Sequence, residues 1–435
     1  MMDRKSDFLN SKAHAKGPFG GLLAFAWVAF LGSLIYTLAS ISSYAFSAGR
    51  SFAFFRIPRI SPVFADLRQL THSSGCDVSF LELLANRSSC DPFQRSFNYT
   101  WPSLELLRGL GIRAADTEVL GALIGVFGVI AASVFVFSLV KSRVKALVVL
   151  TVFILSFPFQ LAIERGNHDI IVFGACLFVP LLVFPPKGLR GRAIKAMTAS
   201  VLAFGAVALK VFPLLGLGPW SFGLAIQWSE RRTTWIPVLI LTLSCLGILI
   251  QITDLPQIMA NTPKPDGLIS FGLLASYQAK YGEGIGMFLT ALKASIVALV
   301  TYAMSTSKFN DLFMAGQVDR RLESSRQAAF MFSCMILIAW MVGRSWDYRL
   351  IIFLGVVPYF ANIFDNVSPA LKSEKLLICL GTSVVLFEPY VGGRIGFVSD
   401  VIIQPVLIGF LLAFLLRNRK TLLASEAGLF EEQPD

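Results

Sequence analysis

The chain has 435 residues, of which 55% are hydrophobic and only 15% charged, and its mean hydropathy is +0.67. Soluble domains carry roughly a quarter charged residues, so this composition excludes an ordinary soluble multidomain protein. Lys and Arg exceed Asp and Glu by 38 to 27, for a net charge of +11. No zinc-finger spacing or basic helix accompanies the excess, and we expect no nucleic-acid partner.

Apolar runs of the length that spans a bilayer recur along the chain. They predict an all-α integral membrane protein, a polytopic bundle of about twelve transmembrane helices. A basic segment at 1–19 precedes the transmembrane domain at 20–416, and a polar tail at 417–435 follows it. The predicted spans are 20–42, 119–140, 146–163, 170–185, 195–212, 213–228, 235–253, 285–304, 327–343, 350–364, 376–391 and 399–416.

The distribution of Lys and Arg sets the orientation, because short loops rich in these residues stay in the cytoplasm. Twelve spans with both termini inside place most Lys and Arg in the inner segments and few in the short outer loops. The first apolar run lacks a small-residue cleavage site and is interpreted as an anchor. We therefore expect an integral protein of a bacterial cytoplasmic membrane with both termini cytoplasmic.

The first outer loop, 43–118, is too long for a simple connector and is expected to form structure of its own. It contains Cys76 and Cys90, which can form a disulfide if the loop faces an oxidising compartment. The alternative is two free thiols. The chain has only three histidines and no Cys/His cluster with metal-ligand spacing, so we predict no metal site.

Residues 102–112 of this loop predict a short amphipathic helix that begins at Pro102 and lies along the membrane surface. Trp101 and Tyr99 are placed at headgroup level.

Polar side chains gather at the outer ends of the predicted spans, in Asp66, the Glu164–Asp169 segment, Lys210 and the Arg344–Arg349 segment. Each has an ordinary interpretation. Asp66 can cap a helix or pair with Arg68, Asp169 can cap the following helix, Glu164 can pair with Arg165, and Lys210 can extend toward the headgroups. The Arg344–Arg349 segment can be an interfacial aromatic belt with surface ion pairs. Ionisable groups at this depth usually face a water-filled cavity, however, and the mixture of acids, amides and cations suits a polar, phosphate-bearing substrate.

The segments Glu164-Arg165-Gly-Asn167-His168-Asp169, Lys210-Val-Phe-Pro213 and Trp346-Asp347-Tyr348-Arg349 resemble signatures of polytopic GT-C glycosyltransferases. The similarity is greatest to glycosyltransferase family 87. It implies an enzyme that takes a sugar from a polyprenyl-phosphate donor and passes it to a glycan or glycolipid acceptor on the extracytoplasmic face. The resemblance implies no cofactor besides this donor substrate.

The resemblance also implies residue roles. An acidic residue of the first outer loop serves as the general base, and Asp66 is the preferred match, with Asp77 and Asp91 as rivals. Glycosyl transfer passes through an oxocarbenium-like state and needs cations at the departing phosphate. Arg165, Lys210 and Arg349 are expected to bind that phosphate, and Glu164, Asn167 and Asp169 the sugar hydroxyls, with His168, Asp347 and Tyr348 completing the substrate site.

Two other functions fit the composition. The first is a carrier or flippase of a lipid-linked or anionic solute, which Lys293 in the middle of a predicted span favours. The absence of a visible inverted repeat, together with polar residues at one face instead of the midplane, opposes it. The second is a structural subunit of an envelope assembly, which leaves the outer charge clusters unexplained.

Overall fold

The computed structural model describes residues 19–46, 63–85, 90–185, 191–229, 231, 233–262, 270–273, 282–306, 320–342, 345–363, 381–387 and 397–424. Most of the predicted amino-terminal segment, the end of the carboxyl-terminal tail and Arg344 lie outside these ranges. For Asp347 and Tyr348 the structure describes the backbone only.

Every predicted span coincides at least in part with a helix, which confirms the all-α membrane class. Eleven spans correspond to named helices: α2 (Phe19–Phe46), α6 (Thr117–Leu139), α7 (Arg143–Leu155) with α8 (Phe157–Glu164), α9 (Asp169–Val183), α10 (Arg192–Leu209), α11 (Leu214–Gln227), α12 (Trp235–Leu249), α15 (Glu283–Thr306), α17 (Arg320–Val342), the 3-10 helix η3 (Asp347–Gly355) with α18 (Val357–Ile363), and the π-helix η5 (Ser399–Ile403) with α21 (Gln404–Ala424). Residues 381–387, within the predicted span 376–391, are also helical.

Length and composition let five of the helices in the described ranges cross a membrane. The pair α7 and α8, bent by 51° at Ser156, makes a sixth candidate, and α9, α12 and the segment Arg349–Ile363 are shorter apolar helices. The number twelve therefore remains a prediction.

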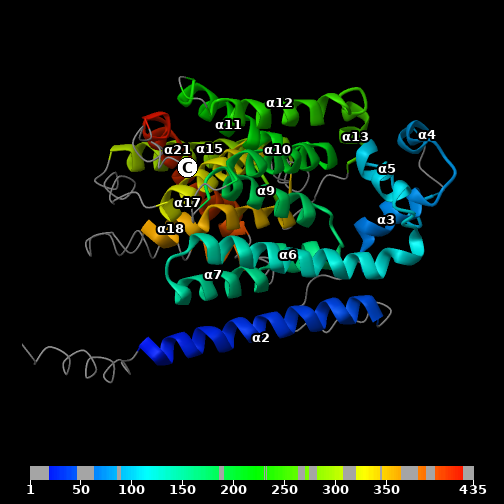
Figure 1. Ribbon diagram of the computed structural model, residues 1–435, viewed down its shortest axis with the longest axis horizontal. Helices are drawn as coiled ribbons and strands as arrows, with labels where there is room; N and C mark the ends of the chain where they lie inside the picture. The colour runs from blue at the N-terminus through cyan, green and yellow to red at the C-terminus, as the bar shows by residue number, and fades with distance from the viewer. Residues whose placement is uncertain are drawn as a thin grey trace, which may run out of the picture.

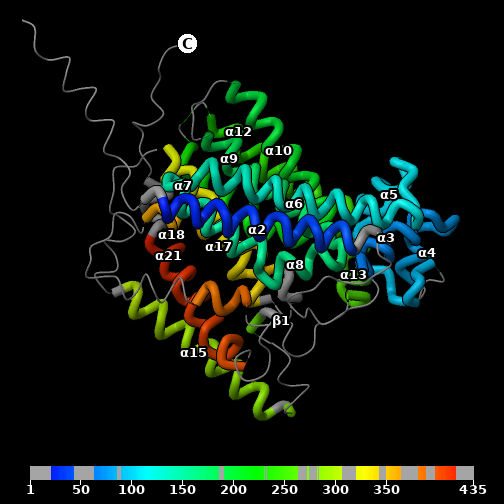
Figure 2. The backbone as a smooth tube through the Cα atoms, turned by 90° about the horizontal axis from the view of Figure 1, so that it is seen from below, coloured from blue at the N-terminus to red at the C-terminus, as the bar shows by residue number. Residues whose placement is uncertain are grey.

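The long helices run roughly side by side, and the helices of the predicted first outer loop gather at one end of the bundle (Figure 1). This outer group comprises α3 (Ala65–Ser74), α4 (Phe80–Ala85), α5 (Trp101–Gly109) and η1 (Ala114–Asp116). Seen from below, α15 and α21 lie together on the side of the bundle away from α12 (Figure 2). The short helix α13 (Leu255–Asn261) reaches the outer group, where Asn261 donates hydrogen bonds to the carbonyl oxygens of Leu84 and Phe97.

The outer group has a small hydrophobic core of its own, which includes Leu83, Phe97 and Leu104. Cys76 and Cys90 form a disulfide beside it, with their Cα atoms 6.1 Å apart. The amphipathic helix predicted at 102–112 is α5, which ends at Gly109, with Pro102 in its first turn and Trp101 45% exposed.

A contact between the outer group and the bundle fixes the start of α3. Phe64 is fully buried, has a left-handed backbone (φ 59°), and donates its N–H to the carbonyl of Glu164 at 2.7 Å. Its ring fills the space beside Gly121 and Gly166, where a Cβ atom would lie 2.8 Å and 3.0 Å from it. Because the N–H of Asp66 then binds the Arg165 carbonyl at 3.1 Å, α3 begins directly over the connection between α8 and α9.

A pair of two-residue strands was not expected in this helical chain. β1 (Ser270–Phe271) pairs antiparallel with β2 (Ser345–Trp346), in the register Ser270 to Trp346 and Phe271 to Ser345. The pair joins the segment after α13 to the chain that enters η3, and Leu273 adds a backbone hydrogen bond to the Trp340 carbonyl at 2.8 Å.

Candidate functional site

The structure brings most of the predicted site residues together at the end of the bundle that carries the outer group. Six of them come from four segments of the chain and join two neighbouring ion-pair networks: Asp66, Arg165, Asn167, Asp169, Lys210 and Arg349.

The first network centres on Asp66, in the first turn of α3. The guanidinium of Arg165 binds both carboxylate oxygens, and the side-chain amide of Asn167 donates to Oδ2 at 3.0 Å. Arg95 Nη1 lies 3.7 Å from Oδ1. Asp66 is neither the N-cap, which is Phe64, nor a partner of Arg68. Both ordinary interpretations of this carboxylate are therefore wrong.

Arg68 instead pairs with Glu118 at the start of α6. This pair holds α3 against α6, whereas Arg165 and Asn167, which bind Asp66, lie in the connection between α8 and α9.

The second network centres on Asp169, the first residue of α9, whose side chain is 1% exposed. Lys210 Nζ lies 3.2 Å from Oδ1, and Arg349 Nε lies 3.8 Å from Oδ2. The N-cap position of α9 is His168, and the side-chain oxygen of Asn167 accepts the Asp169 N–H at 2.9 Å. Asp169 is thus not the cap expected from its position, and the Lys210 ammonium points at a carboxylate.

Tyr99 connects the two networks. Its hydroxyl donates to the Asp66 carbonyl at 2.7 Å, its ring centroid lies 5.1 Å from that of His168, and Lys210 Nζ lies 5.5 Å above the ring. Tyr99 is only 5% exposed. The ring therefore packs against the site residues, and its predicted position at headgroup level stays a prediction.

His168 lies in the connection between α8 and α9 and is buried. Burial, and then the nearby Lys210 ammonium, lowers the pKa of His168 to about 3. The imidazole is therefore neutral at physiological pH, and it is suited to hydrogen bonding and stacking and not to carrying charge.

Two hydroxyls of the outer group fix the backbone that leads to Lys210. Thr100 Oγ1 donates to the Ala208 carbonyl at 3.0 Å, and Ser103 Oγ donates to that of Leu209 at 3.2 Å. These carbonyls belong to the last turn of α10, which has no intrahelical partners for them. Lys210 follows in an extended conformation, so its side chain leaves the helix toward Asp169.

The remaining predicted residues lie at the edge of the site. Glu164 ends α8 and is 4% exposed. Asp347 and Tyr348 begin η3, directly before Arg349, whose guanidinium also lies 5.7 Å from the Phe212 ring centroid.

The rival bases occupy different surroundings. Asp91 is 3% exposed, and its Oδ2 accepts both the backbone N–H and the Nε of Arg95, at 2.8 Å and 2.9 Å. Asp91 therefore orients Arg95 toward Asp66. Sequence reasoning missed Arg95, because i, i+4 spacing brings side chains together on a helix and residues 91–95 form a turn instead.

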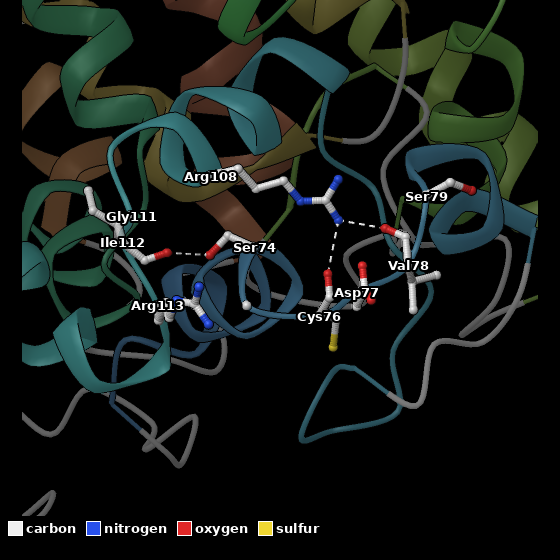
Figure 3. A pocket seen from close by; sticks show the side chains of 10 residues that line it. Ser74, Cys76, Asp77, Val78, Ser79, Arg108, Gly111, Ile112 and Arg113 are labelled. Atoms are coloured by element: carbon white, nitrogen blue, oxygen red, sulfur yellow. Dashed lines mark hydrogen bonds between the residues drawn. The ribbon is translucent and has the colours of Figure 1, made fainter.

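Asp77 is exposed and lines an open polar cavity of about 560 Å³ in the outer group (Figure 3). Arg108 holds one wall of this cavity by donating to the carbonyls of Cys76 and Val78 at 3.3 Å and 2.6 Å. The cavity shares no lining residue with the two networks.

Within the described ranges, no three His, Cys, Asp or Glu side chains gather in a way that could hold a metal ion.

Sequence comparison finds no matching protein family and no matching curated protein. Comparison with solved structures finds a similarity to the crystal structure of ArnT from Cupriavidus metallidurans in the apo state. The TM-score is 0.39 and the sequence identity 13%, over 90% of this chain and 76% of that one. Identity this low transfers no residue roles from that protein to this one.

Proposed function

We propose that the chain is a GT-C type membrane glycosyltransferase, which transfers a sugar from a polyprenyl-phosphate donor to a glycan or glycolipid acceptor at the outer face of the membrane. One observation carries the proposal: Arg165, Lys210 and Arg349 come from separate segments and converge around two largely buried carboxylates at one end of the bundle. Charges arranged in this way suit a substrate with both an anionic phosphate and sugar hydroxyls.

In the proposed reaction the bond between the anomeric carbon and the phosphate oxygen breaks, and a bond from that carbon to an acceptor hydroxyl oxygen forms. Arg165, Lys210 and Arg349 stabilise the charge that develops on the departing polyprenyl phosphate. Asp66 accepts the proton of the acceptor hydroxyl. Asn167 and Glu164 bind sugar hydroxyls.

The bidentate contact of Asp66 with Arg165 implies that the donor binds before the base can act. In the structure, Arg165 contacts both oxygens of the proposed base. A donor phosphate competes for the same guanidinium, and its binding frees a carboxylate oxygen for the acceptor proton. The base thus becomes available when the donor is in place, which limits proton abstraction from water.

Lys293, the residue that favoured a carrier, has its partners within the protein. Lys293 Nζ binds Asp400 Oδ1 at 2.7 Å and the Gly272 carbonyl at 3.2 Å, all within the protein. The buried ammonium therefore needs no transported anion to balance it.

The direct test incubates the full-length protein in lipid nanodiscs with radiolabelled polyprenyl-phosphate sugars and a membrane glycan extract as the acceptor. Transfer by the unmutated protein is expected. Asp66→Asn keeps the side-chain shape but cannot accept a proton, so turnover should fall about 10²- to 10⁴-fold. Asp77→Asn is the matched control and should keep normal turnover. Normal turnover of Asp66→Asn would remove Asp66 from the mechanism.

Donor binding is measured separately, with sugar-free polyprenyl phosphate as the ligand. Loss of one charge-assisted hydrogen bond to phosphate costs about 1.5–3 kcal/mol, so Lys210→Gln should weaken binding about ten- to a hundredfold. Arg113→Gln, at an exposed arginine that lines the outer cavity, is the control. No binding by the unmutated protein, together with movement of a lipid-linked substrate between leaflets, would favour the carrier.

A further inference from the structure

A second buried charge pair lies apart from the proposed site, between α15 and η5. Lys293 is 0% exposed, and its ammonium binds Asp400 Oδ1 at 2.7 Å. Asp400 lies in the π-helical turn at the start of the α21 span. Such turns are rare and occur frequently at functional sites. Sequence reasoning singled out Lys293 alone, because Asp400 lies more than 100 residues away in the chain.

The Lys293 ammonium also binds the backbone carbonyl of Gly272 at 3.2 Å. Gly272 directly follows β1, and Leu273 donates its N–H to the Trp340 carbonyl. The buried pair therefore holds the chain at the end of β1 against α17 and α15.

The strand pair carries this contact to the proposed site. β1 pairs with β2, and β2 is followed directly by η3, whose third residue is Arg349. Arg349 in turn reaches Asp169. A continuous set of contacts thus runs from Asp400 through Lys293, the Gly272 carbonyl and the strand pair to the guanidinium.

From this we infer that Lys293 and Asp400 are positioning residues, which fix the strand pair and thereby set Arg349 at the phosphate-binding position. The inference rests on the proposed function for the identity of the ligand, but the geometric part stands without it. Neither residue touches the substrate.

Burial explains why both members are needed. A lone buried ammonium or carboxylate is strongly unfavourable, whereas a well-packed apolar pair of similar volume is often as stable as a buried ion pair. A purely structural role therefore requires no charges here. The ammonium, unlike an apolar side chain, can donate to Asp400 and to a backbone carbonyl at once, and this second bond fixes the position of β1.

The test uses the double variant Lys293→Met/Asp400→Asn, which removes both charges and leaves neither buried alone. The first readout is geometric and independent of activity. In a Phe271→Cys/Ser345→Cys background, the register places the two introduced cysteines opposite each other, and mild oxidation should link them. We expect slower linking in the double variant than in the background with the pair intact.

The second readout is polyprenyl-phosphate binding. The double variant should bind about tenfold more weakly, as Arg349→Gln does, because displacing the guanidinium forfeits its charge-assisted contact. Adding Arg349→Gln to the double variant should cause no further loss, since the pair acts through Arg349. The 271–345 disulfide, once formed, should restore binding to the double variant.

Gln327→Met is the matched control. It removes a buried polar side chain from the same bundle, where Gln327 accepts a hydrogen bond from Trp220 at 2.9 Å. Gln327 lies on α17 about 22 Å from Val342, at 1.5 Å per residue. This control should leave both linking and binding unchanged.

Unchanged linking in a folded double variant would overturn the inference, as would losses in binding that simply add to that of Arg349→Gln. If the unmutated protein binds no polyprenyl phosphate, the proposed function fails while the linking experiment still decides the positioning role.

Discussion

Replacing Lys210 by glutamine removes the nearer of the two cations that balance the buried carboxylate of Asp169. At an effective dielectric constant of about 20, a unit charge pair at 3.2 Å interacts by about 5 kcal/mol, and one at 3.8 Å by about 4 kcal/mol. Lys210→Gln leaves Asp169 with Arg349 alone, and the glutamine amide compensates in part. We therefore expect a loss of about 2–4 kcal/mol of stability, against about 3–5 kcal/mol for a carboxylate left with no cation.

Asp169→Asn should cost less. It leaves two cations, whose side chains are 20% and 23% exposed and can regain water, whereas the carboxylate they bind cannot. Combining Lys210→Gln with Asp169→Asn leaves no carboxylate at position 169 that has lost a cation, so the double variant should be more stable than Lys210→Gln alone.

The assay is thermal unfolding of the detergent-purified variants followed by tryptophan fluorescence, at one scan rate because unfolding of such proteins is often irreversible. The expected order of apparent Tm is unmutated protein, Asp169→Asn, double variant, Lys210→Gln. Equal losses for the two single variants that add in the double variant would refute the electrostatic account of this network.

Three further outcomes are expected. Gly166→Ala should lower the apparent Tm, because φ is +59° and the added Cβ would meet neighbours at 3.0 Å, while Gly205→Ala, with open space around it, should not. Ser79→Cys should react with an impermeant maleimide on intact cells, and Ala193→Cys only after permeabilisation; the reverse result would invert the topology. The fold lowers the pKa of His168 from about 6.5 in the unfolded chain to about 3. The free energy of unfolding should therefore fall as the pH drops from about 6.5 toward 3, because the unfolded chain binds the proton more readily. This fall should be shallower in His168→Gln, which has no imidazole to protonate.

The membrane class could be predicted because the length of each apolar run can be counted in the sequence and compared with the thickness of a bilayer. The outer loop was harder to interpret. Tyr99 follows a polar stretch and looks like an interfacial aromatic, yet the Thr100 and Ser103 contacts to α10 draw it inward until its ring meets His168 and Lys210. Nothing local in the sequence shows that these hydroxyls will bind carbonyls about 100 residues away.

The convergence of Asp66 with the Glu164–Asp169 segment was expected from topology alone, since charge counting placed both on the outer face. Their pairing was not. Arg165 was expected to bind a phosphate, and the structure pairs it with Asp66. The Lys293–Asp400 pair was not predicted for a similar reason. A lysine within an apolar span shows that a charge must be compensated, but the sequence does not show which distant residue compensates it.

The docking of α3 on the bundle depends on main-chain atoms, the N–H groups of Phe64 and Asp66 with the carbonyls of Glu164 and Arg165. Such bonds do not depend on the side chains at 66, 164 and 165, so substitution at these three positions can change the chemistry of the site while its framework persists. Over evolutionary time, that separation lets one scaffold acquire new site chemistry by few substitutions. The packing around Phe64, Gly121 and Gly166, in contrast, leaves little room for change.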